Sequence, residues 1–438
     1  MSDAALFSVG DPVPVPPLAP GTPRFQVPDR LQSECLPVAL DQLVERDHQV
    51  RVVWDFVEKV DLAILHAHIR AFENRPGRPP ICPRVLRGLW LFATLRGVGS
   101  ARRLAQLCDE SIPFRWLCGG ISVNYPTLAD FRSMSAELFE RVLIHHITAL
   151  RATGLVTLDH VAHDGVRVRA CAGTGSFRSR QSLAELRQEA VDQVAALRAE
   201  LDANPAAASA REKAARIRSA RERQERIEEA LAQLPDVEAK KKDKRKKARV
   251  SITDPDARVM KMANSGFNPA LNVQLSADTK SQIIVGVGVS TSGSDHGLLV
   301  EAINRIEAQS GDVPDKGSFD GGFANVASIE TWSKPPYEME VYAPPTEHKD
   351  KNGKVLKAKK EPTPVVKEWH ERMKTPEGQA IYKERASTIE CVNALARNRG
   401  LQQFRVRGLA KVEAVVLLFA VAHNLAREAS LREKAQAK

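Results

Sequence analysis

One stretch of this chain gathers side chains of the kinds that handle phosphate groups and metal ions. The segment YKERASTIECVNALARNRG, residues 382–400, contains Glu390 and, seven residues later, Arg397. Its apolar residues recur at helical spacing, and seven residues span about two helical turns, so Glu390 and Arg397 would share a face. With Tyr382 and Arg385 beside them, these groups suit a metal ion next to a phosphodiester. An amphipathic surface helix with charge pairs has the same local pattern.

Two aspartates follow strand-like runs far upstream of that helix. Asp164 lies in VTLDHVAHDGVRVRA, and Asp320 lies in KGSFDGGFAN, where two glycines allow backbone to approach a ligand closely. Asp159 precedes Asp164 on the same predicted strand but, with regular alternation, on the opposite face. His163 is expected to support the site rather than to be a ligand. An isolated Asp-Gly is a common turn, so it is the order Asp, Asp, Glu in a basic chain that indicates metal-dependent phosphoryl transfer.

In these residues the chain resembles the DDE transposases of bacterial insertion sequences, which have a ribonuclease-H-like catalytic core. The family's C-terminal signature, Tyr-x2-Arg-x3-Glu-x6-Lys, is matched here by Tyr382, Arg385, Glu390 and Arg397. Two departures are visible: one extra residue separates Arg385 from Glu390, and the last basic residue is an arginine. The extra residue leaves the role of Arg385 open. Glu390 is the candidate carboxylate, since an isoleucine precedes it, and Glu384 is the next.

The resemblance implies cleavage at transposon ends followed by attack of the new 3′-hydroxyl on target DNA. Asp164, Asp320 and Glu390 would be the catalytic residues. They would also be the ligands of Mg²⁺ or Mn²⁺, with two ions, and the cations would offset the repulsion among clustered carboxylates.

The resemblance also implies where DNA is held. Tyr382, Arg385 and Arg397 would contact end DNA, and the reactions of this group often pass through a DNA hairpin. A basic run either contacts the DNA phosphates as well or is only a solvated linker. Its residues are Lys240, Lys241, Lys242, Lys244 and Arg245. Trp332 or Trp369 would stack on a displaced base unless both are core residues. The expected partners are double-stranded DNA, as transposon ends and as target, and a second copy of the chain, with no membrane.

A mixed sheet with flanking helices is needed to bring the three carboxylates together. The sequence predicts an α/β fold with a ribonuclease-H-like mixed sheet, preceded by an all-helical N-terminal domain and carrying an inserted helical hairpin. The first core strand is predicted at Val156–Ala162, with part of a second at Val166–Ala170. Apolar alternation predicts further strands at Leu271–Ala277, Ile283–Val289, Gly317–Phe319 and Val341–Ala343. Helical spacing predicts a crossing helix at Gly297–Gln309 and another helix at Val326–Trp332.

The same pattern divides the chain into segments. They are a disordered or extended Pro-rich lead-in (1–35), an all-helical domain (36–153), the first part of the catalytic core (154–181), a helical hairpin with a basic end (182–250), the rest of the core with a basic insertion at 344–376 (251–430), and a polar tail (431–438). In the helical domain, Ser100 and Thr127 are expected N-caps around a helix-turn-helix. That module either binds the terminal repeats or serves only for packing.

Bulk composition limits the classes of protein that fit. The formal net charge is +10 with a pI near 9.3, which favours a polyanionic partner. Six cysteines without a C-x-x-C pair argue against a zinc ribbon or a disulfide framework. No apolar run of membrane-spanning length and no signal peptide are apparent, so a cytoplasmic, nucleoid-associated protein is expected.

Three other functions remain open from the sequence. A DNA-binding protein that has lost catalysis would keep the basic charge, although this chain retains all three carboxylates. A coiled-coil interaction protein organised on residues 182–234 would leave the core strands unexplained. A nuclease without strand transfer fits the same residues.

Overall fold

The fold is described from a computed structural model. It describes residues 38–60, 80–133, 136–203, 210–240, 247–264, 266–345 and 361–437. The predicted lead-in, the basic run at 241–246 and residues 346–360 of the predicted basic insertion lie outside this part of the chain.

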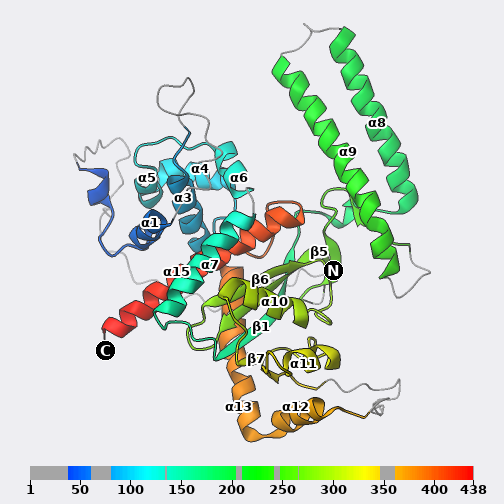
Figure 1. The fold of residues 1–438 in the computed structure, drawn as a ribbon. Helices are drawn as coiled ribbons and strands as arrows, with labels where there is room; N and C mark the ends of the chain where they lie inside the picture. Colours follow the sequence, from blue (N-terminus) through cyan, green and yellow to red (C-terminus); the bar gives the residue numbers. More distant parts are fainter. Residues whose placement is uncertain are drawn as a thin grey trace, which may run out of the picture. The chain divides into compact units, whose positions relative to one another are not determined.

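A six-stranded mixed sheet lies at the centre of residues 40–438 (Figure 1). Strand β1 pairs antiparallel with β5 on one side and parallel with β7 on the other, and β7 pairs parallel with β8. The far side of β5 pairs with β4 along its first part and with β6 along its second. The strands are β1 (His160–Arg169), β4 (Arg258–Lys261), β5 (Phe267–Asp278), β6 (Ile284–Ser290), β7 (Lys316–Ser318) and β8 (Glu340–Tyr342).

The first core strand differs from its predicted bounds. The predicted strands Val156–Ala162 and Val166–Ala170 are replaced by one strand, β1, which places Asp164 in its middle rather than after its end. The ladder begins only at His160 because Leu158 has a positive φ of 59°, which a strand does not allow. It continues through Gly165 because β5 pairs with β1 along residues 161–169.

Helices precede the sheet, and their buried residues belong to the same apolar core as those of the sheet. Ser100 caps α4, accepting a hydrogen bond from the backbone N–H of Arg103, as predicted. Thr127 is not a cap: Asn124 caps α6, and its Oδ1 accepts from the N–H of Thr127. The helical elements before the sheet, in the part of the chain that the structure describes, are η1 (Leu40–Leu43), α1 (Gln49–Lys59), α3 (Pro83–Leu95), α4 (Ala101–Glu110), α5 (Ile112–Cys118), α6 (Tyr125–Arg132) and α7 (Ala136–Ala152).

The remaining helices of the core lie between the later strands or after the last of them. The predicted helix Val326–Trp332 has those bounds, and the crossing helix begins two residues later than predicted. These helical elements are α10 (Leu299–Ser310), α11 (Val326–Trp332), α12 (Pro364–Lys374), α13 (Pro376–Arg385), a π-helical turn η3 (Ala386–Glu390), α14 (Cys391–Asn398) and α15 (Leu409–Gln436).

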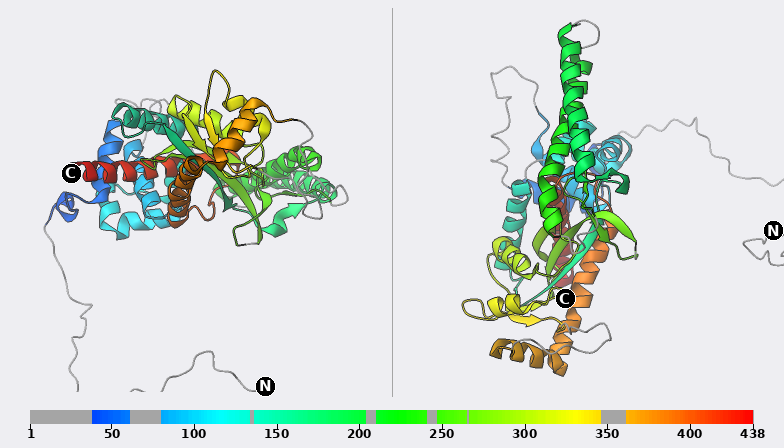
Figure 2. Two further views of the ribbon diagram at one scale, coloured as in Figure 1. Left: turned by 90° about the horizontal axis from the view of Figure 1, so that it is seen from below. Right: turned by 90° about the vertical axis from the view of Figure 1, so that its right-hand side faces the viewer.

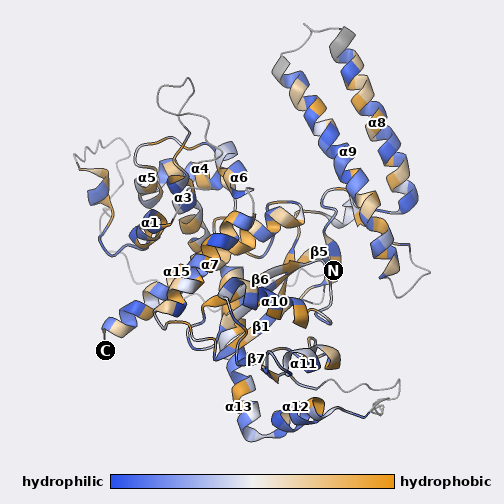
Figure 3. Ribbon diagram, viewed as in Figure 1, coloured by the Kyte–Doolittle hydropathy of each residue, from blue (hydrophilic) through white to orange (hydrophobic). Residues whose placement is uncertain are grey.

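Helix α15 joins the helical segment to the sheet. It contacts α3, α7 and β6, and residues 416–425 are buried without interruption. Figure 3 shows a hydrophobic first half and a hydrophilic end. By length and composition α15 could cross a membrane, but 67% of its apolar window is buried inside the protein, as in the core helix of a folded domain.

Two side-chain amides protect the outer edge of β6. Asn424 of α15 accepts from the N–H of Ile284 and donates to its carbonyl oxygen. Gln309 of α10 makes the same pair of bonds with Val287. An unpaired strand edge is a template for aggregation, and these two amides satisfy the backbone groups of Ile284 and Val287 that a further strand would otherwise pair with.

The predicted hairpin forms, with helices α8 (Arg180–Ala203) and α9 (Ala210–Ala239) lying side by side in every view (Figures 1 and 2). Ion pairs join the start of one helix to the end of the other, so the helices are antiparallel: Arg180–Glu238, Arg187–Glu228 and Arg216–Glu200. The hairpin has an apolar cluster of its own. At its base, β2 (Phe177–Arg178) pairs with β3 (Val250–Ser251), so the chain leaves and returns at one place.

Removing the hairpin should leave a core that folds. We expect that joining Ser179 to Arg249 through a two-residue Asn-Gly turn will close β2 and β3 as an ordinary β-hairpin. The product should remain soluble and unfold in one cooperative transition, because the hairpin's own cluster supplies its stability. Urea denaturation followed by circular dichroism tests this. A broad transition or insoluble protein would show that the core depends on the contacts of Gln233 with Asp256 and Arg258.

Candidate active site

Asp164 occupies the middle of the sheet. Its Oδ1 lies 3.2 Å from Nη2 of Arg385, and its Oδ2 accepts a hydrogen bond of 3.1 Å from the amide of Asn393. The side chain is 23% exposed. Burial raises the pKa of the Asp164 carboxyl, the charges of Asp320 and Asp295 act in the same direction, and Arg385 opposes them.

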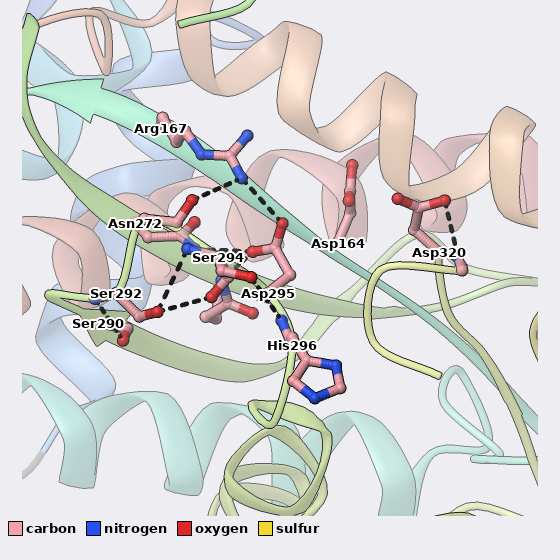
Figure 4. A network of polar contacts seen from close by, with 12 residues as sticks. Asp164, Arg167, Asn272, Ser290, Ser292, Ser294, Asp295, His296 and Asp320 are labelled. Atoms are coloured by element: carbon pink, nitrogen blue, oxygen red, sulfur yellow. Dashed lines mark hydrogen bonds and ion pairs between the residues drawn. The ribbon is translucent and has the colours of Figure 1, made fainter. Parts of the chain in front are cut away.

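Asp320 follows β7, the parallel neighbour of β1. The residue is exposed, and its Oδ1 accepts from the N–H of Gly321. Figure 4 shows the carboxylates of Asp164 and Asp320 turned in the same direction. They come together because β1 and β7 are adjacent and run parallel.

The extra residue before Glu390 is accommodated by a π-helical turn. Helix α13 ends at Arg385, residues 386–390 form η3, and α14 continues from there. A π turn holds one more residue than an α turn, so residues five apart meet as residues four apart do in an α-helix. Nη1 of Arg385 accordingly lies 3.6 Å from Oε1 of Glu390. At this turn the backbone carbonyl of Glu384 accepts hydrogen bonds from the side-chain hydroxyls of Ser387 and Thr388.

Arg385 lies between two of the three candidate carboxylates. Its guanidinium contacts Asp164 and Glu390, and its side chain is only 11% exposed. Its Nε is buried and has no hydrogen-bond partner in the part of the chain that the structure describes. Glu390, in contrast, is 61% exposed, so it is free to change its contacts.

The donor set suits a hard divalent cation, because it offers carboxylate oxygens alone. The raised pKa of Asp164 reflects burial and negative charge that one arginine does not fully offset. Among the residues placed by the structure, no three His, Cys, Asp or Glu side chains are close enough to hold an ion. The guanidinium of Arg385 holds the position between Asp164 and Glu390, so binding of a cation there requires Arg385 to move.

Tyr382 belongs to the same cluster. Burial raises the pKa of its phenol, the charges of Asp320, Asp164 and Glu390 raise it further, and Arg385 lowers it. The phenol therefore lies within electrostatic range of all three carboxylates. This cluster also contains Asn393, which the sequence did not single out, although its position three residues after Glu390 puts it on the same helical face.

Asp295, in the loop after β6, is a further carboxylate that the sequence did not reveal. It pairs with Arg167 at 3.1 Å and accepts from Asn272 at 2.7 Å (Figure 4). A Cβ at position 165 would lie 2.6 Å from Oδ1 of Asp295 and from Nε2 of Gln274. A side chain at position 165 would therefore push the ends of the Asp295 and Gln274 side chains aside.

The histidines near Asp164 have structural contacts. His163 is buried, bonds with Ser276 and Gln274, and packs against Phe319 and Phe323. Burial lowers its pKa to about 4, so it is neutral at physiological pH. His160 contacts Ser318 through Nε2.

The alternative carboxylates point to other partners. The carboxylate of Glu384 contacts Nδ1 of His160 at 3.0 Å, which turns it away from Arg385. Asp159 precedes β1 and pairs with Lys280 at the surface, which lowers its pKa.

The predicted DNA contacts are only partly within the described residues. Lys240 is exposed at the end of α9, whereas Lys241, Lys242, Lys244 and Arg245 lie outside them. Arg397 is exposed on α14. Trp332 and Trp369 are both buried, so neither is available to stack on a base.

Two family models match parts of the chain. Residues 346–429 match the Transposase DDE domain, and residues 38–135 match the Transposase domain (DUF772). The first match contains Tyr382, Arg385, Glu390 and Arg397, while Asp164 and Asp320 lie outside both. No curated protein and no solved structure matched the chain.

Proposed function

Because the chain belongs to the DDE transposases of insertion sequences, we propose that it cuts DNA at transposon ends and joins the 3′-hydroxyl to target DNA. The catalytic residues in this proposal are Asp164, Asp320 and Glu390. The observation that supports it is Arg385, whose guanidinium contacts both Asp164 and Glu390, together with the parallel pairing of β1 with β7, the strand that Asp320 follows. The pKa of Tyr382 responds to the charge of all three.

The proposal extends to the fold. A ribonuclease-H-like core is supported by the strand order β6-β5-β1-β7-β8, in which β5 alone runs antiparallel to its neighbours. This order brings the centre of β1 next to the end of β7, where Asp164 and Asp320 lie. An all-helical module before the sheet is supported by α1 and α3–α7.

The three carboxylates would hold Mg²⁺ or Mn²⁺, which activates an attacking hydroxyl and stabilises the leaving oxygen when two ions are bound. Asn393 holds Asp164 in position through its amide. Tyr382 and Arg385 bind phosphate of the end DNA beside the carboxylates, and the unpartnered Nε of Arg385 adds a donor for it. The active complex contains two copies of the chain on double-stranded DNA in the cytoplasm.

A nicking assay tests the function. Purified protein should convert supercoiled plasmid to nicked or linear DNA only when Mg²⁺ or Mn²⁺ is present. A labelled oligonucleotide with a free 3′-hydroxyl that matches the element's end should also become joined to the plasmid. DNA binding without cleavage would indicate a protein that has lost catalysis, cleavage without joining would indicate a nuclease, and no DNA binding would favour an interaction protein built on the hairpin.

A further inference from the structure

Two open cavities meet beside β1 and form one basic groove. The first, of about 820 Å³, extends from Gly165 along β1 to Arg397 and Gln402. The second, of about 470 Å³, is lined by Gly97–Ser100 and Arg103 of the helical segment. Both cavities share Arg169, Arg397 and Gln402 in their lining, so they are continuous. We call this surface the basic groove; its cations are Arg103, Arg167, Arg169, Lys261, Arg397 and Arg405.

The charged residues that line the basic groove are all cationic, and no aspartate or glutamate is among the residues that the structure places there. Arg167 is paired with Asp295 and Arg103 with Glu110. The other four cations are exposed, and among the described residues none of them has a side-chain hydrogen bond or ion pair. Unpaired cations gathered along one groove without a carboxylate create a field that favours a polyanion.

Backbone contacts hold the two halves of the groove together. A Cβ on Gly97 would lie 3.3 Å from the carbonyl oxygen of Asn398, and a Cβ on Gly400 would lie 3.2 Å from that of Gly97. Both glycines have positive φ, 71° and 94°. The turn before α4 therefore packs directly on the end of α14, which requires glycine on both sides.

Backbone hydrogen bonds hold Arg169 against the segment that follows α14. Its N–H donates to the carbonyl of Gln402, and its carbonyl accepts from the N–H of Phe404. These bonds place Arg169 close to Arg405 in the chain that lines the second cavity. The groove is thus a preformed surface shared by the sheet and the helical segment.

We propose that the basic groove binds one sugar–phosphate backbone of double-stranded DNA and leads it from the side of Asp164 to the N-terminus of α4. This inference rests on the proposed function for the identity of the polyanion. Phosphate contacts use arginine, lysine, amide side chains and helix N-termini, and the groove offers all four, the amides including Asn268 and Gln402. Grooves for single strands add aromatic side chains for base stacking, and no aromatic residue of the described chain lines this one.

Binding by a charge-neutralised variant tests the groove without relying on catalysis. The variant combines Arg169→Gln, Lys261→Gln and Arg405→Gln. Its affinity for a fluorescent duplex of arbitrary sequence is measured in EDTA over a range of salt concentrations. Each lost phosphate contact removes about 0.9 from the slope of log K against log[salt], so the slope should fall by about 2.7 and affinity by about tenfold or more.

A matched control carries the same change in charge away from the groove. Lys334→Gln, Lys367→Gln and Lys411→Gln remove three exposed lysines that do not line either cavity. This control should retain the wild-type slope. Arg169→Lys with Arg405→Lys should also retain it, because a phosphate contact needs the positive charge. Thermal melting should show that every variant is folded.

Other outcomes would overturn the proposal. An unchanged slope in the neutralised variant, or an equal loss in the control, would mean that the groove does not hold DNA. A greater loss with a single strand of the same length than with the duplex would reassign the groove to single strands. Failure of the nicking assay together with the expected change in slope would refute the proposed catalysis and leave the groove as a DNA-binding surface.

Discussion

Replacing Asp164 with Asn should reduce divalent-ion-dependent strand cleavage by at least about a hundredfold, the scale of losing one preorganised electrostatic contact. Asp320→Asn and Glu390→Gln should have effects of the same size. Each substitution keeps the shape of the side chain and removes one negative charge that the reaction needs. DNA binding should hold or tighten, because affinity comes from basic side chains and a repulsive carboxylate near phosphate has been removed.

Asp159→Asn is the control for the first carboxylate. Asp159 is close to Asp164 in the sequence, but it precedes β1 and pairs with Lys280 at the surface. Cleavage by this variant should match the wild type. If Asp159→Asn abolished cleavage while Asp164→Asn did not, the assignment of the first carboxylate would be wrong.

Glu384→Gln is the control for the third carboxylate. Glu384 contacts His160 rather than Arg385, so its loss should leave cleavage within a few-fold of the wild type. Normal cleavage by Glu390→Gln, with loss in Glu384→Gln, would transfer the catalytic role to Glu384. Quantitative plasmid nicking, with duplex binding measured in parallel, distinguishes these cases.

The sequence predicted those parts of the fold that have a local signal. Apolar alternation located β5 and β6, and the recurrence of leucines and alanines located α8 and α9. The sequence-based prediction started this strand at Val156, whereas β1 starts at His160. The positive φ of Leu158 depends on how the chain enters the sheet and not on residue type, so the sequence does not reveal it. The cap of α6 was also missed, since Asn124 and Thr127 are both acceptable caps and only the backbone geometry distinguishes them.

The candidate site was less predictable than the strands. The order of the carboxylates indicated the candidate residues, but the contact between Arg385 and Asp164 joins two distant parts of the sequence and leaves no local pattern. The same is true of Asp295, whose position depends on Arg167 and Asn272. The extra residue before Glu390 was visible in the sequence, yet its accommodation by a π turn required the structure.

The position of Arg385 leads to a second prediction, on the protein without DNA. Arg385→Gln should destabilise the fold at neutral pH by about 2–4 kcal/mol, because Asp164 loses the cation that offsets its burial. The pKa of Asp164, already raised, would rise further. A raised carboxyl pKa contributes stability below the pKa of the unfolded chain, and this stability is lost as pH rises through the folded pKa. The variant should therefore be closer to the wild type at acidic pH than at neutral pH.

A double substitution separates the charge effect from simple loss of packing. Asp164→Asn in the Arg385→Gln background removes both members of the pair, so no unpaired buried charge remains. Stability should recover part of the loss, and the four proteins of the cycle give the coupling directly. No recovery would show that Arg385 stabilises the site through its contacts with other groups.

Divalent cations provide the decisive measurement. In the wild type a cation must displace the guanidinium from between Asp164 and Glu390, whereas in Arg385→Gln it need not. The rise in Tm with Mg²⁺ should therefore reach half its maximum at roughly tenfold lower concentration in the variant, the equivalent of one charged hydrogen bond. Strand cleavage should nevertheless fall, because the guanidinium is no longer present to bind phosphate. Weaker Mg²⁺ binding by the variant would instead mean that Arg385 holds the carboxylates in place for the ion and does not compete with it.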